Sequence, residues 1–156
     1  MKIEIYSKKS INRLISEGFP DKTAVISFYT PKSERKEEEV RVDYCGVCDN
    51  YFYIGIHDID IEILEEYGYT YDSYLAESNR LARFIYKMKD EGYDIICQCD
   101  FGQSRSAACA AAILEHFEKR GINIFADYRY YPNQLVYHKV FDALETISNN
   151  HNTINS

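Results

Sequence analysis

A cysteine and an arginine, Cys99 and Arg105, stand six positions apart in the segment Cys-Asp-Phe-Gly-Gln-Ser-Arg-Ser at residues 99–106. A short apolar stretch precedes this segment and an alanine-rich stretch follows it, so it should connect a buried strand to a helix. Such a loop directs backbone N–H groups inward at the start of the helix, where the helix dipole adds partial positive charge. The pattern therefore indicates an anion-binding loop that holds a thiol.

Several positions of this loop suit a phosphate dianion. The field at the helix start favours the thiolate of Cys99, which is the nucleophilic form of cysteine. Gly102 permits a positive φ and leaves no Cβ in the path of a ligand. Arg105 can hold two phosphate oxygens with its planar fork, and the Ser106 hydroxyl can donate toward the sulfur. The residues expected to bind phosphate, mainly through backbone amides, are Asp100, Phe101, Gly102, Gln103, Ser104 and Arg105.

The segment resembles the signature of the cysteine-based protein tyrosine phosphatases, C-x-x-G-x-x-R-S/T between a strand and a helix, and all four fixed positions match. Across residues 51–147 the order of expected elements resembles the compact dual-specificity type. In that type a Pro-Asn pair braces the phosphate loop, and Pro132-Asn133 is similar to it. The resemblance implies a phosphomonoester hydrolase that forms a phosphocysteine, and it favours a phosphoprotein substrate.

One position departs from this pattern, because the family usually has histidine before the nucleophile and this chain has Gln98. A glutamine can still hydrogen-bond the loop and support it, but it carries no positive charge. We therefore expect the Cys99 thiolate to be less favoured, which affects the rate more than the type of reaction.

The family also uses an aspartate upstream of the cysteine to protonate the leaving oxygen. Asp58 and Asp60 follow the apolar stretch at residues 51–56 and are the candidates, and similar members place the acid at the first turn beyond this strand, which favours Asp58. Either residue could instead cap a turn. His57 beside them is expected to face solvent.

Other interpretations of the loop stay open. Cys99 could be a buried structural cysteine, with Arg105 pairing with a neighbouring carboxylate. The fold could also serve as a catalytically weak or inactive phosphate-binding module, although the presence of both residues argues against this. Among enzymes, the substrate could be phosphotyrosine, phosphoserine or phosphothreonine, an inositol phosphate, or the 5′ end of an RNA.

The elements that must position these residues follow from hydrophobic periodicity. Apolar stretches predict strands at residues 2–6, 23–29, 51–56 and 93–97. Helical spacing predicts helices at residues 10–17, 72–89 and 105–120, and a last helix with Pro132 in its first turn. Gly121 should stop the third of these helices in a left-handed conformation. Residues 32–41 are almost all charged and should form a solvated loop or hairpin.

This alternation of strands and helices predicts an α/β fold with a mostly parallel central sheet flanked by helices. We expect one catalytic domain at residues 1–148 and a polar C-terminal tail at residues 149–156. The apolar face that packs the last helix on the core should consist of Val136, Val140, Leu144 and Ile147. The tyrosines at positions 67, 69, 71, 74, 128, 130 and 131 should cover helix ends with half-buried rings, with a wall for an aromatic phosphoester as the alternative.

Net charge excludes some partners. A charge of −7 opposes nonspecific binding to nucleic acid and to anionic membranes, so local donors must capture an anionic substrate.

No apolar run approaches the ~18 residues that cross a bilayer, and residues 1–6 alternate rather than forming a signal peptide. We therefore expect a soluble cytoplasmic protein, with its oligomeric state left open.

The five cysteines are expected to be reduced thiols. Cys45 and Cys48 form a single C-x-x-C, whereas a structural zinc site normally has four ligands. Cys97 and Cys99 could complete such a site only at the expense of the nucleophile. We therefore expect two half-buried thiols around a tight turn, a core position for Cys109, and no metal or organic cofactor.

Overall fold

A computed structural model describes the backbone of residues 1–155 and the side chains of these residues except 37, 39 and 151–155. Its centre is a four-stranded sheet with the order β1-β4-β2-β3, and each neighbouring pair is parallel. The strands are β1 (Ile3–Ser7), β2 (Thr23–Tyr29), β3 (Tyr51–Gly55) and β4 (Asp94–Cys99). The predicted α/β class with a central parallel sheet is confirmed.

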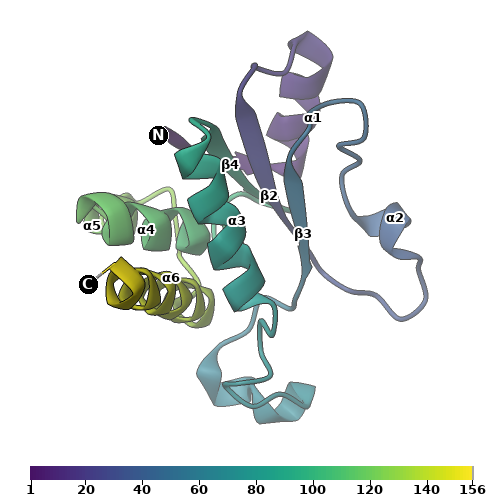
Figure 1. The fold of residues 1–156 in the computed structure, drawn as a ribbon. Helices are drawn as coiled ribbons and strands as arrows, with labels where there is room; N and C mark the ends of the chain where they lie inside the picture. The colour runs from purple at the N-terminus through teal and green to yellow at the C-terminus, as the bar shows by residue number, and fades with distance from the viewer. Residues whose placement is uncertain (156) are drawn as a thin grey trace.

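Helices cover both faces of this sheet (Figure 1). One face carries α3 (Ser78–Asp90), α4 (Arg105–Glu118), α5 (Ile122–Phe125) and α6 (Gln134–Asn155), and the other face carries α1 (Lys8–Glu17). The segment between β2 and β3 contains the single turn α2 (Glu37–Val40), and the segment between β3 and α3 contains the 3-10 turns η1 (Ile61–Ile63) and η2 (Glu65–Tyr67). None of the helices in residues 1–155 has the length and apolar character needed to cross a membrane.

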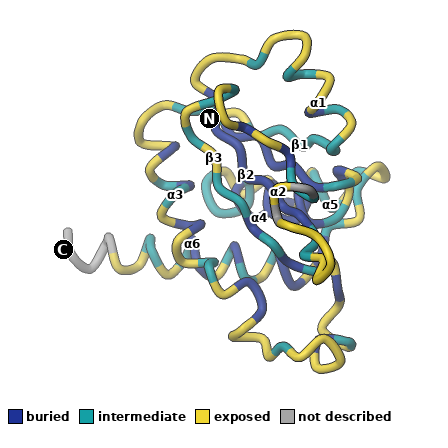
Figure 2. Tube along the Cα trace, turned by 90° about the vertical axis from the view of Figure 1, so that its right-hand side faces the viewer, coloured by how far each residue is buried: buried dark blue, intermediate teal, exposed yellow. Residues whose placement is uncertain are grey.

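Side chains alternate across the two central strands and form a core on each face. On the face of α3, α4 and α6, Ile26 and Phe28 of β2 join the larger core. On the face of α1, Val25 of β2 and Ile96 of β4 pack with Ile11 in a smaller core. Figure 2 shows the buried segments concentrated in the sheet and on the inner sides of the helices. The two central strands are therefore held from both sides.

The parallel arrangement brings the carboxyl ends of all four strands to one edge of the sheet. The segment at residues 99–105 leaves β4 there, and the segment at residues 56–60 leaves β3. Since ligands of open α/β sheets bind beyond the carboxyl ends of strands, this edge is the expected place for a site.

The helix predicted at residues 72–89 begins later, at Ser78. Before it, Thr70 and Ser73 exchange hydrogen bonds between side chain and backbone, which favours turns over a helix. Leu75 then adopts a positive φ of 52°, so the chain enters the helix from a left-handed turn. Leu75 is nevertheless buried.

The stop predicted for α4 at Gly121 is wrong. Lys119 takes the left-handed conformation with φ 58°, whereas Gly121 has φ −57° and is the N-cap residue of α5. A Cβ on Gly121 would lie 2.8 Å from the backbone oxygen of Ala111 and from Cβ of Glu115. Gly121 therefore permits close packing against α4 rather than a left-handed turn.

The last helix, α6, begins at Gln134, two residues after Pro132. Its core-facing positions Val136, Val140 and Leu144 are buried, as the periodicity predicted. The helical backbone continues to Asn155, past the boundary at residue 148 that we expected between domain and tail.

Candidate active site

The segment at residues 99–105 forms the loop between β4 and α4, and Cys99 is the last residue of the strand. The Cys99 sulfur is buried and lies 3.0 Å from Oγ of Ser106 in the first turn of α4. Gly102 has φ 67°, the positive value predicted for it. A Cβ at Gly102 would lie 2.7 Å from the backbone nitrogen of Ser7, so the end of β1 also requires glycine there.

Arg105 is buried at the start of α4, and one side of its guanidinium is bound by the protein. Nη1 donates to Oγ1 of Thr30 (2.9 Å) and to the backbone oxygen of Ile56 (2.8 Å). Nη2 lies 3.4 Å from Oδ2 of Asp100. Nε is the one buried side-chain polar atom without a hydrogen-bond partner among the side chains that the structure describes. The edge of the fork formed by Nε and Nη2 is therefore the edge suited to an anion.

Asp58 contacts the loop directly. Its Oδ1 accepts hydrogen bonds from Oγ of Ser104 and from Nδ2 of Asn133, both at 2.7 Å. Asp60 instead precedes η1 and lines a cavity of about 480 Å³ with Tyr71 and His138, to which residues 99–105 do not contribute. The structure thus brings Asp58, and not Asp60, into contact with the cysteine loop.

His57 takes no part in these contacts. Its ring packs against the ring of Tyr67, with 5.1 Å between centroids. Its backbone oxygen accepts a 2.7 Å hydrogen bond from the hydroxyl of Tyr74, which is buried. Burial raises the pKa of the Tyr74 phenol well above its usual value, so this donor keeps its proton.

Asn133 joins three segments around the loop. Its backbone N–H donates to the Ser104 oxygen (3.2 Å), and Nδ2 donates to the Ile59 oxygen (3.0 Å) as well as to Asp58. Its Oδ1 accepts from the backbone N–H of Val136 (3.0 Å) in the first turn of α6. One buried side chain therefore connects the aspartate segment, the cysteine loop and a helix start.

Gln98 points to the opposite face of β4 from Cys99. Its Oε1 accepts from Oγ of Ser27 (2.6 Å) and from the hydroxyl of Tyr44 (2.8 Å), and its Nε2 donates to the Cys99 backbone oxygen (3.0 Å). All three side chains are buried. Burial raises the pKa of Tyr44 well above its usual value, so Tyr44 remains a donor to Gln98.

Sequence reasoning missed three residues of this site: Thr30, Ser27 and Tyr44. Two of them carried a signal, because Ser27 is a hydroxyl inside an otherwise apolar strand and Thr30 is the first residue after that strand. Tyr44 lies in an irregular segment 54 positions from Gln98, and no periodicity marks it.

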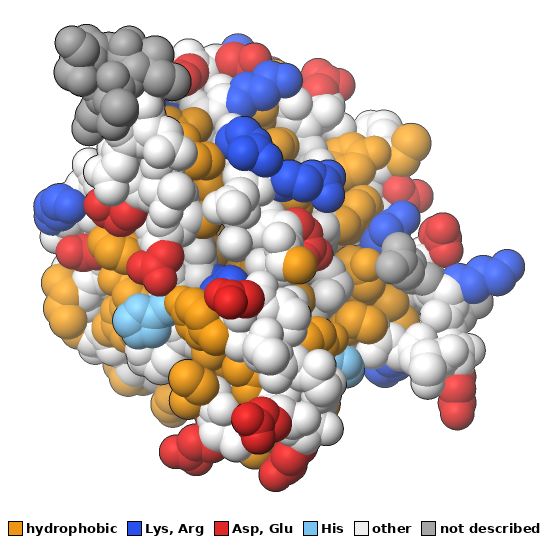
Figure 3. Space-filling view, turned by 60° about the horizontal axis from the view of Figure 1, so that its bottom comes forward, with side chains coloured by type: hydrophobic (Ala, Val, Ile, Leu, Met, Phe, Trp, Pro, Cys, Tyr) orange, Lys and Arg blue, Asp and Glu red, His pale blue; other side chains and the backbone are white. Residues whose placement is uncertain are grey.

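Two tyrosine rings that we expected to be half-buried are exposed, as is the ring of Phe101 in the loop. Phe101 is 82% exposed, Tyr131 is 72% exposed and Tyr128 is 88% exposed, so these tyrosines do not cover helix ends. Tyr131 is tied to the loop through its backbone N–H, which donates to the Gln103 oxygen (2.8 Å). On the face of the molecule shown in Figure 3, hydrophobic side chains lie among acidic and basic ones.

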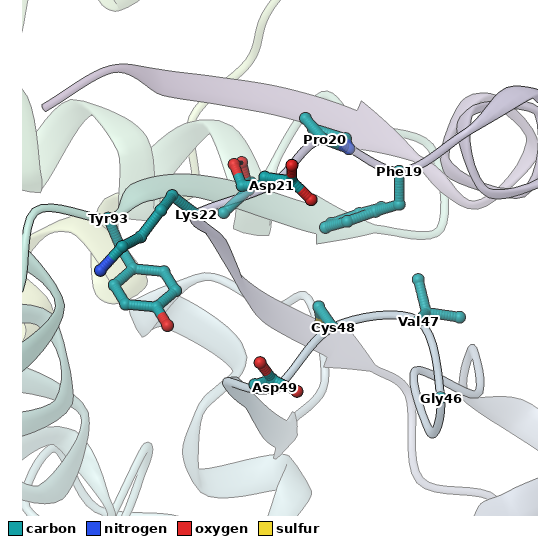
Figure 4. Close-up of a pocket in the computed structure, with 10 residues that line it drawn as sticks. Phe19, Pro20, Asp21, Lys22, Gly46, Val47, Cys48, Asp49 and Tyr93 are labelled. Carbon is teal, nitrogen blue, oxygen red and sulfur yellow. Dashed lines mark hydrogen bonds between the residues drawn. The ribbon is translucent and has the colours of Figure 1, made fainter.

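A separate cavity of about 220 Å³ lies at the amino ends of β2, β3 and β4 and is shown in Figure 4. Cys48 lines it, and burial raises the pKa of this thiol to about 11, which disfavours the thiolate that binds metals. Cys45 is exposed. Among the described residues, no three His, Cys, Asp or Glu side chains gather in a group that could hold a metal ion.

No protein-family model matches the sequence, and no curated protein matches it. Solved structures do match over most of the chain. A structure of PTPMT1 in complex with PI(5)P has a TM-score of 0.56 at 13% identity and covers 96% of this chain and 94% of its own. The human tyrosine phosphatase-like serine/threonine/tyrosine-interacting protein has a TM-score of 0.55 at 17% identity, and the match covers 91% of this chain and 86% of that one. Human DUSP28 has a TM-score of 0.52 at 11% identity, and the match covers 95% of this chain and 94% of that one.

These similarities show that the chain has the fold of the compact cysteine-based tyrosine and dual-specificity phosphatases. The fold that the resemblance implied is confirmed. At such low identities the likeness extends to the fold and not to the activity.

Proposed function

We propose that this chain, with its tyrosine-phosphatase fold, hydrolyses phosphate monoesters through a phosphocysteine formed on Cys99. The observation that carries the proposal is the buried, unpartnered Nε of Arg105 beside the loop that begins at Cys99. A buried N–H of a permanent cation is costly without an acceptor, and a phosphate oxygen supplies one.

In the first step the Cys99 sulfur attacks phosphorus, so that an S–P bond forms while the bond from phosphorus to the ester oxygen breaks. Asp58 donates a proton to the departing oxygen, which leaves as an alcohol or phenol. The two hydrogen bonds to Oδ1 of Asp58 orient its carboxyl group and leave Oδ2 as the oxygen that carries this proton.

In the second step water attacks phosphorus and the S–P bond breaks, which releases inorganic phosphate. Asp58, now a carboxylate, accepts the proton of the water. Ser106, 3.0 Å from the sulfur, donates its hydroxyl hydrogen toward the thiolate as it leaves. Backbone amides of residues 100–105 and the Arg105 fork stabilise the charge on the equatorial oxygens in both steps.

We further propose a phosphoprotein as the substrate class. The order of elements typical of dual-specificity phosphatases supports it, and so do the exposed rings of Phe101 and Tyr131 next to the loop, which offer contacts to a peptide. A panel of phosphotyrosine and phosphoserine peptides, an inositol phosphate and an RNA with a 5′ phosphate tests this class directly.

The test of the reaction compares wild type with Cys99→Ser on a simple aryl phosphate in the presence of a metal chelator. Wild type should hydrolyse the ester and be inhibited by vanadate, and Cys99→Ser should be inactive. Cys45→Ser, which alters an exposed cysteine outside the loop, is the matched control and should keep full activity. Turnover by Cys99→Ser at the wild-type rate would refute the mechanism.

Arg105→Lys separates phosphate binding by a fork from simple charge attraction. Lysine keeps the positive charge but cannot contact two oxygens at once, so kcat should fall steeply. Near-normal kinetics would show that Arg105 does not bind the phosphate group.

A second candidate is a phosphate-binding module with little turnover. Two observations favour it: the uncharged Gln98 stands before Cys99, and the Asp100 carboxylate lies 3.4 Å from Nη2 of Arg105. Tight phosphopeptide binding by wild type without phosphate release would establish this candidate instead.

A further inference from the structure

A pocket of about 320 Å³ adjoins the cysteine loop on the side of the segment between β2 and α2. Its lining residues come from the start of α1, from that segment, from the end of α2 and from the loop itself: Lys8, Thr30, Lys32, Arg35, Val40, Asp100 and Phe101. Three of them are cations, in a chain whose formal net charge is −7. The pocket is therefore a local exception to the charge of the whole molecule.

None of the described side chains neutralises the three cations. Within the described side chains, no carboxylate pairs with Lys8, Lys32 or Arg35, and the one hydrogen bond of these side chains is a long one, 3.5 Å from Lys8 Nζ to the Val40 oxygen. Asp100 is the one carboxylate among the described side chains that line the pocket, and it lies 3.4 Å from Arg105. Glu34 does not line this pocket, but it lines a neighbouring hollow together with Lys32 and Arg35, without forming an ion pair with either.

The pocket adjoins the guanidinium of Arg105, at Nη1 through Thr30 and at Nη2 through Asp100. Thr30 and Asp100 line it, and both contact the guanidinium of Arg105, at 2.9 Å and 3.4 Å. A molecule whose phosphate occupies the cysteine loop would thus place its neighbouring groups beside Lys32 and Arg35. Anionic groups at that position would gain from the unpaired charges.

The surroundings favour a peptide over a small polyol phosphate. Phe101 lines the pocket and is 82% exposed. Tyr131 is 72% exposed and is held beside the loop, because its backbone N–H donates to the Gln103 oxygen. A ligand that fills the pocket and also contacts Tyr131 must extend along several residues of the loop. A peptide chain has this length and presents apolar as well as anionic side chains.

We propose that this pocket binds an acidic side chain next to the phosphorylated residue, so that the preferred substrates are acidic phosphopeptides. The inference rests on the proposed function and deepens it. The recognised chemistry is an anionic side chain, either the carboxylate of Asp or Glu or the phosphate of a second phosphorylated residue.

The test uses the full chain and three phosphotyrosine peptides of one length, flanked on both sides by Gln, by Glu or by phosphoserine. Each exposed ion pair contributes modestly, so two or three together should lower KM for the Glu peptide about tenfold relative to the Gln peptide, with kcat unchanged. The phosphoserine peptide should gain at least as much, and the preference should shrink at high salt because exposed charges are screened.

The deciding variant is Lys32→Gln with Arg35→Gln, which should reduce the ratio between the Glu and Gln peptides to within about twofold. Arg13→Gln with Arg83→Gln removes the same charge from exposed positions on α1 and α3 and should keep the full preference. An equal loss in both double variants would overturn the inference, because only the overall charge would then matter. An unchanged ratio in the Lys32/Arg35 variant would also overturn it.

Two further arms separate this inference from its premise. The first arm compares an inositol bisphosphate with an inositol monophosphate. A preference for the bisphosphate that is lost in the Lys32/Arg35 variant, together with no preference among the peptides, would overturn the peptide assignment. If no ester is hydrolysed, the proposed function fails. In that case the three peptides, carrying a fluorescent label, are bound to Cys99→Ser with and without the Lys32/Arg35 substitutions. Tighter binding of the Glu peptide that depends on Lys32 and Arg35 supports the acidic preference, and equal binding of the Glu and Gln peptides overturns it.

Discussion

Asp58 and Asp60 are two positions apart in the sequence, yet their surroundings differ. Asp58 accepts hydrogen bonds from Ser104 and Asn133 beside the loop, whereas Asp60 lines a cavity outside it. Sequence spacing alone could not separate them, because alternate residues of an extended chain face alike. Only the contacts with segments from positions 104 and 133 distinguish the two aspartates.

Asp58→Asn should therefore slow hydrolysis of phosphotyrosine or an alkyl phosphate by ~10²- to 10⁴-fold, because a poor leaving group needs a proton. An activated aryl ester should be affected little, since its leaving group departs without one. Asp60→Asn should be mild on both esters. The measurement is kcat for both variants on both esters; a leaving-group-dependent loss confined to Asp60→Asn would transfer the acid role to Asp60.

The carboxylate of Asp100 competes with a bound phosphate for Arg105, because Oδ2 lies 3.4 Å from Nη2. Asp100→Asn should strengthen binding of inorganic phosphate about three- to tenfold, since it removes a negative charge beside the anion. The inhibition constant of phosphate against aryl phosphate hydrolysis measures this effect. Asp49→Asn, which alters an exposed aspartate of the cavity in Figure 4, is the control. Equal inhibition constants for Asp100→Asn and wild type would show no competition.

At the scale of elements, Asn133 ties the start of α6 to the cysteine loop and to the segment after β3. Its side chain makes three hydrogen bonds, to Asp58, to the Ile59 oxygen and from the Val136 N–H. The resemblance predicted a bracing role for this residue. It did not predict the contact with Asp58, because that pairing spans 75 positions.

Asn133→Ala should lower the free energy of unfolding by about 2–3 kcal/mol, because it removes a helix-capping acceptor and leaves the Ile59 carbonyl with one donor fewer. It should also lower kcat most on poor leaving groups, since Asp58 loses one of its two donors. Urea unfolding and the two-ester comparison measure the two effects. Gln134→Ala changes the exposed neighbour and should alter neither. A stability loss without any leaving-group dependence would limit Asn133 to a structural role.

The elements show where periodicity is a sufficient guide and where it is not. The buried stripe of α6 and the strand β2 follow directly from apolar spacing, and the structure has them as predicted. The start of α3 and the end of α4 do not follow, because hydrogen bonds of Thr70 and Ser73 and the left-handed turns at Leu75 and Lys119 decide them. Non-glycine residues with positive φ are uncommon, so no sequence rule would place the turns there.

At the scale of the whole molecule, the order of strands decides which residues meet. The central position of β4, between β1 and β2, places Cys99 at the middle of the sheet edge and Gln98 against Ser27 of β2. The alternation of strands and helices predicts a parallel sheet but leaves this order open. Tyr44 could therefore not be assigned to the site beforehand, and Thr30 was marked only by its position directly after β2.

Two buried tyrosines join the site to the two cores of the molecule. Tyr44, in the core on the face of α1, donates to Gln98, and Tyr74, in the core on the face of α3, donates to the His57 oxygen. Burial raises the pKa of both phenols in the folded protein. The unfolded chain ionises at about pH 10 and then binds fewer protons than the folded chain. The stabilisation is thus complete below pH 10 and is lost as the pH rises further.

Tyr74→Phe should reveal this linkage as a crossing of two stability curves. At pH 8 the variant should be less stable than wild type by about 1 kcal/mol, because it lacks the hydrogen bond to the His57 oxygen. Above pH 10 wild type should lose about 1.4 kcal/mol per pH unit through Tyr74 alone, a loss that the variant avoids, so the curves should cross near pH 11. Urea unfolding between pH 8 and pH 11.5 measures both curves, with Tyr128→Phe as the exposed control whose curve should follow that of wild type. Parallel curves for Tyr74→Phe and wild type would mean that Tyr74 ionises as readily in the folded chain as in the unfolded one, and burial would then not hold its proton.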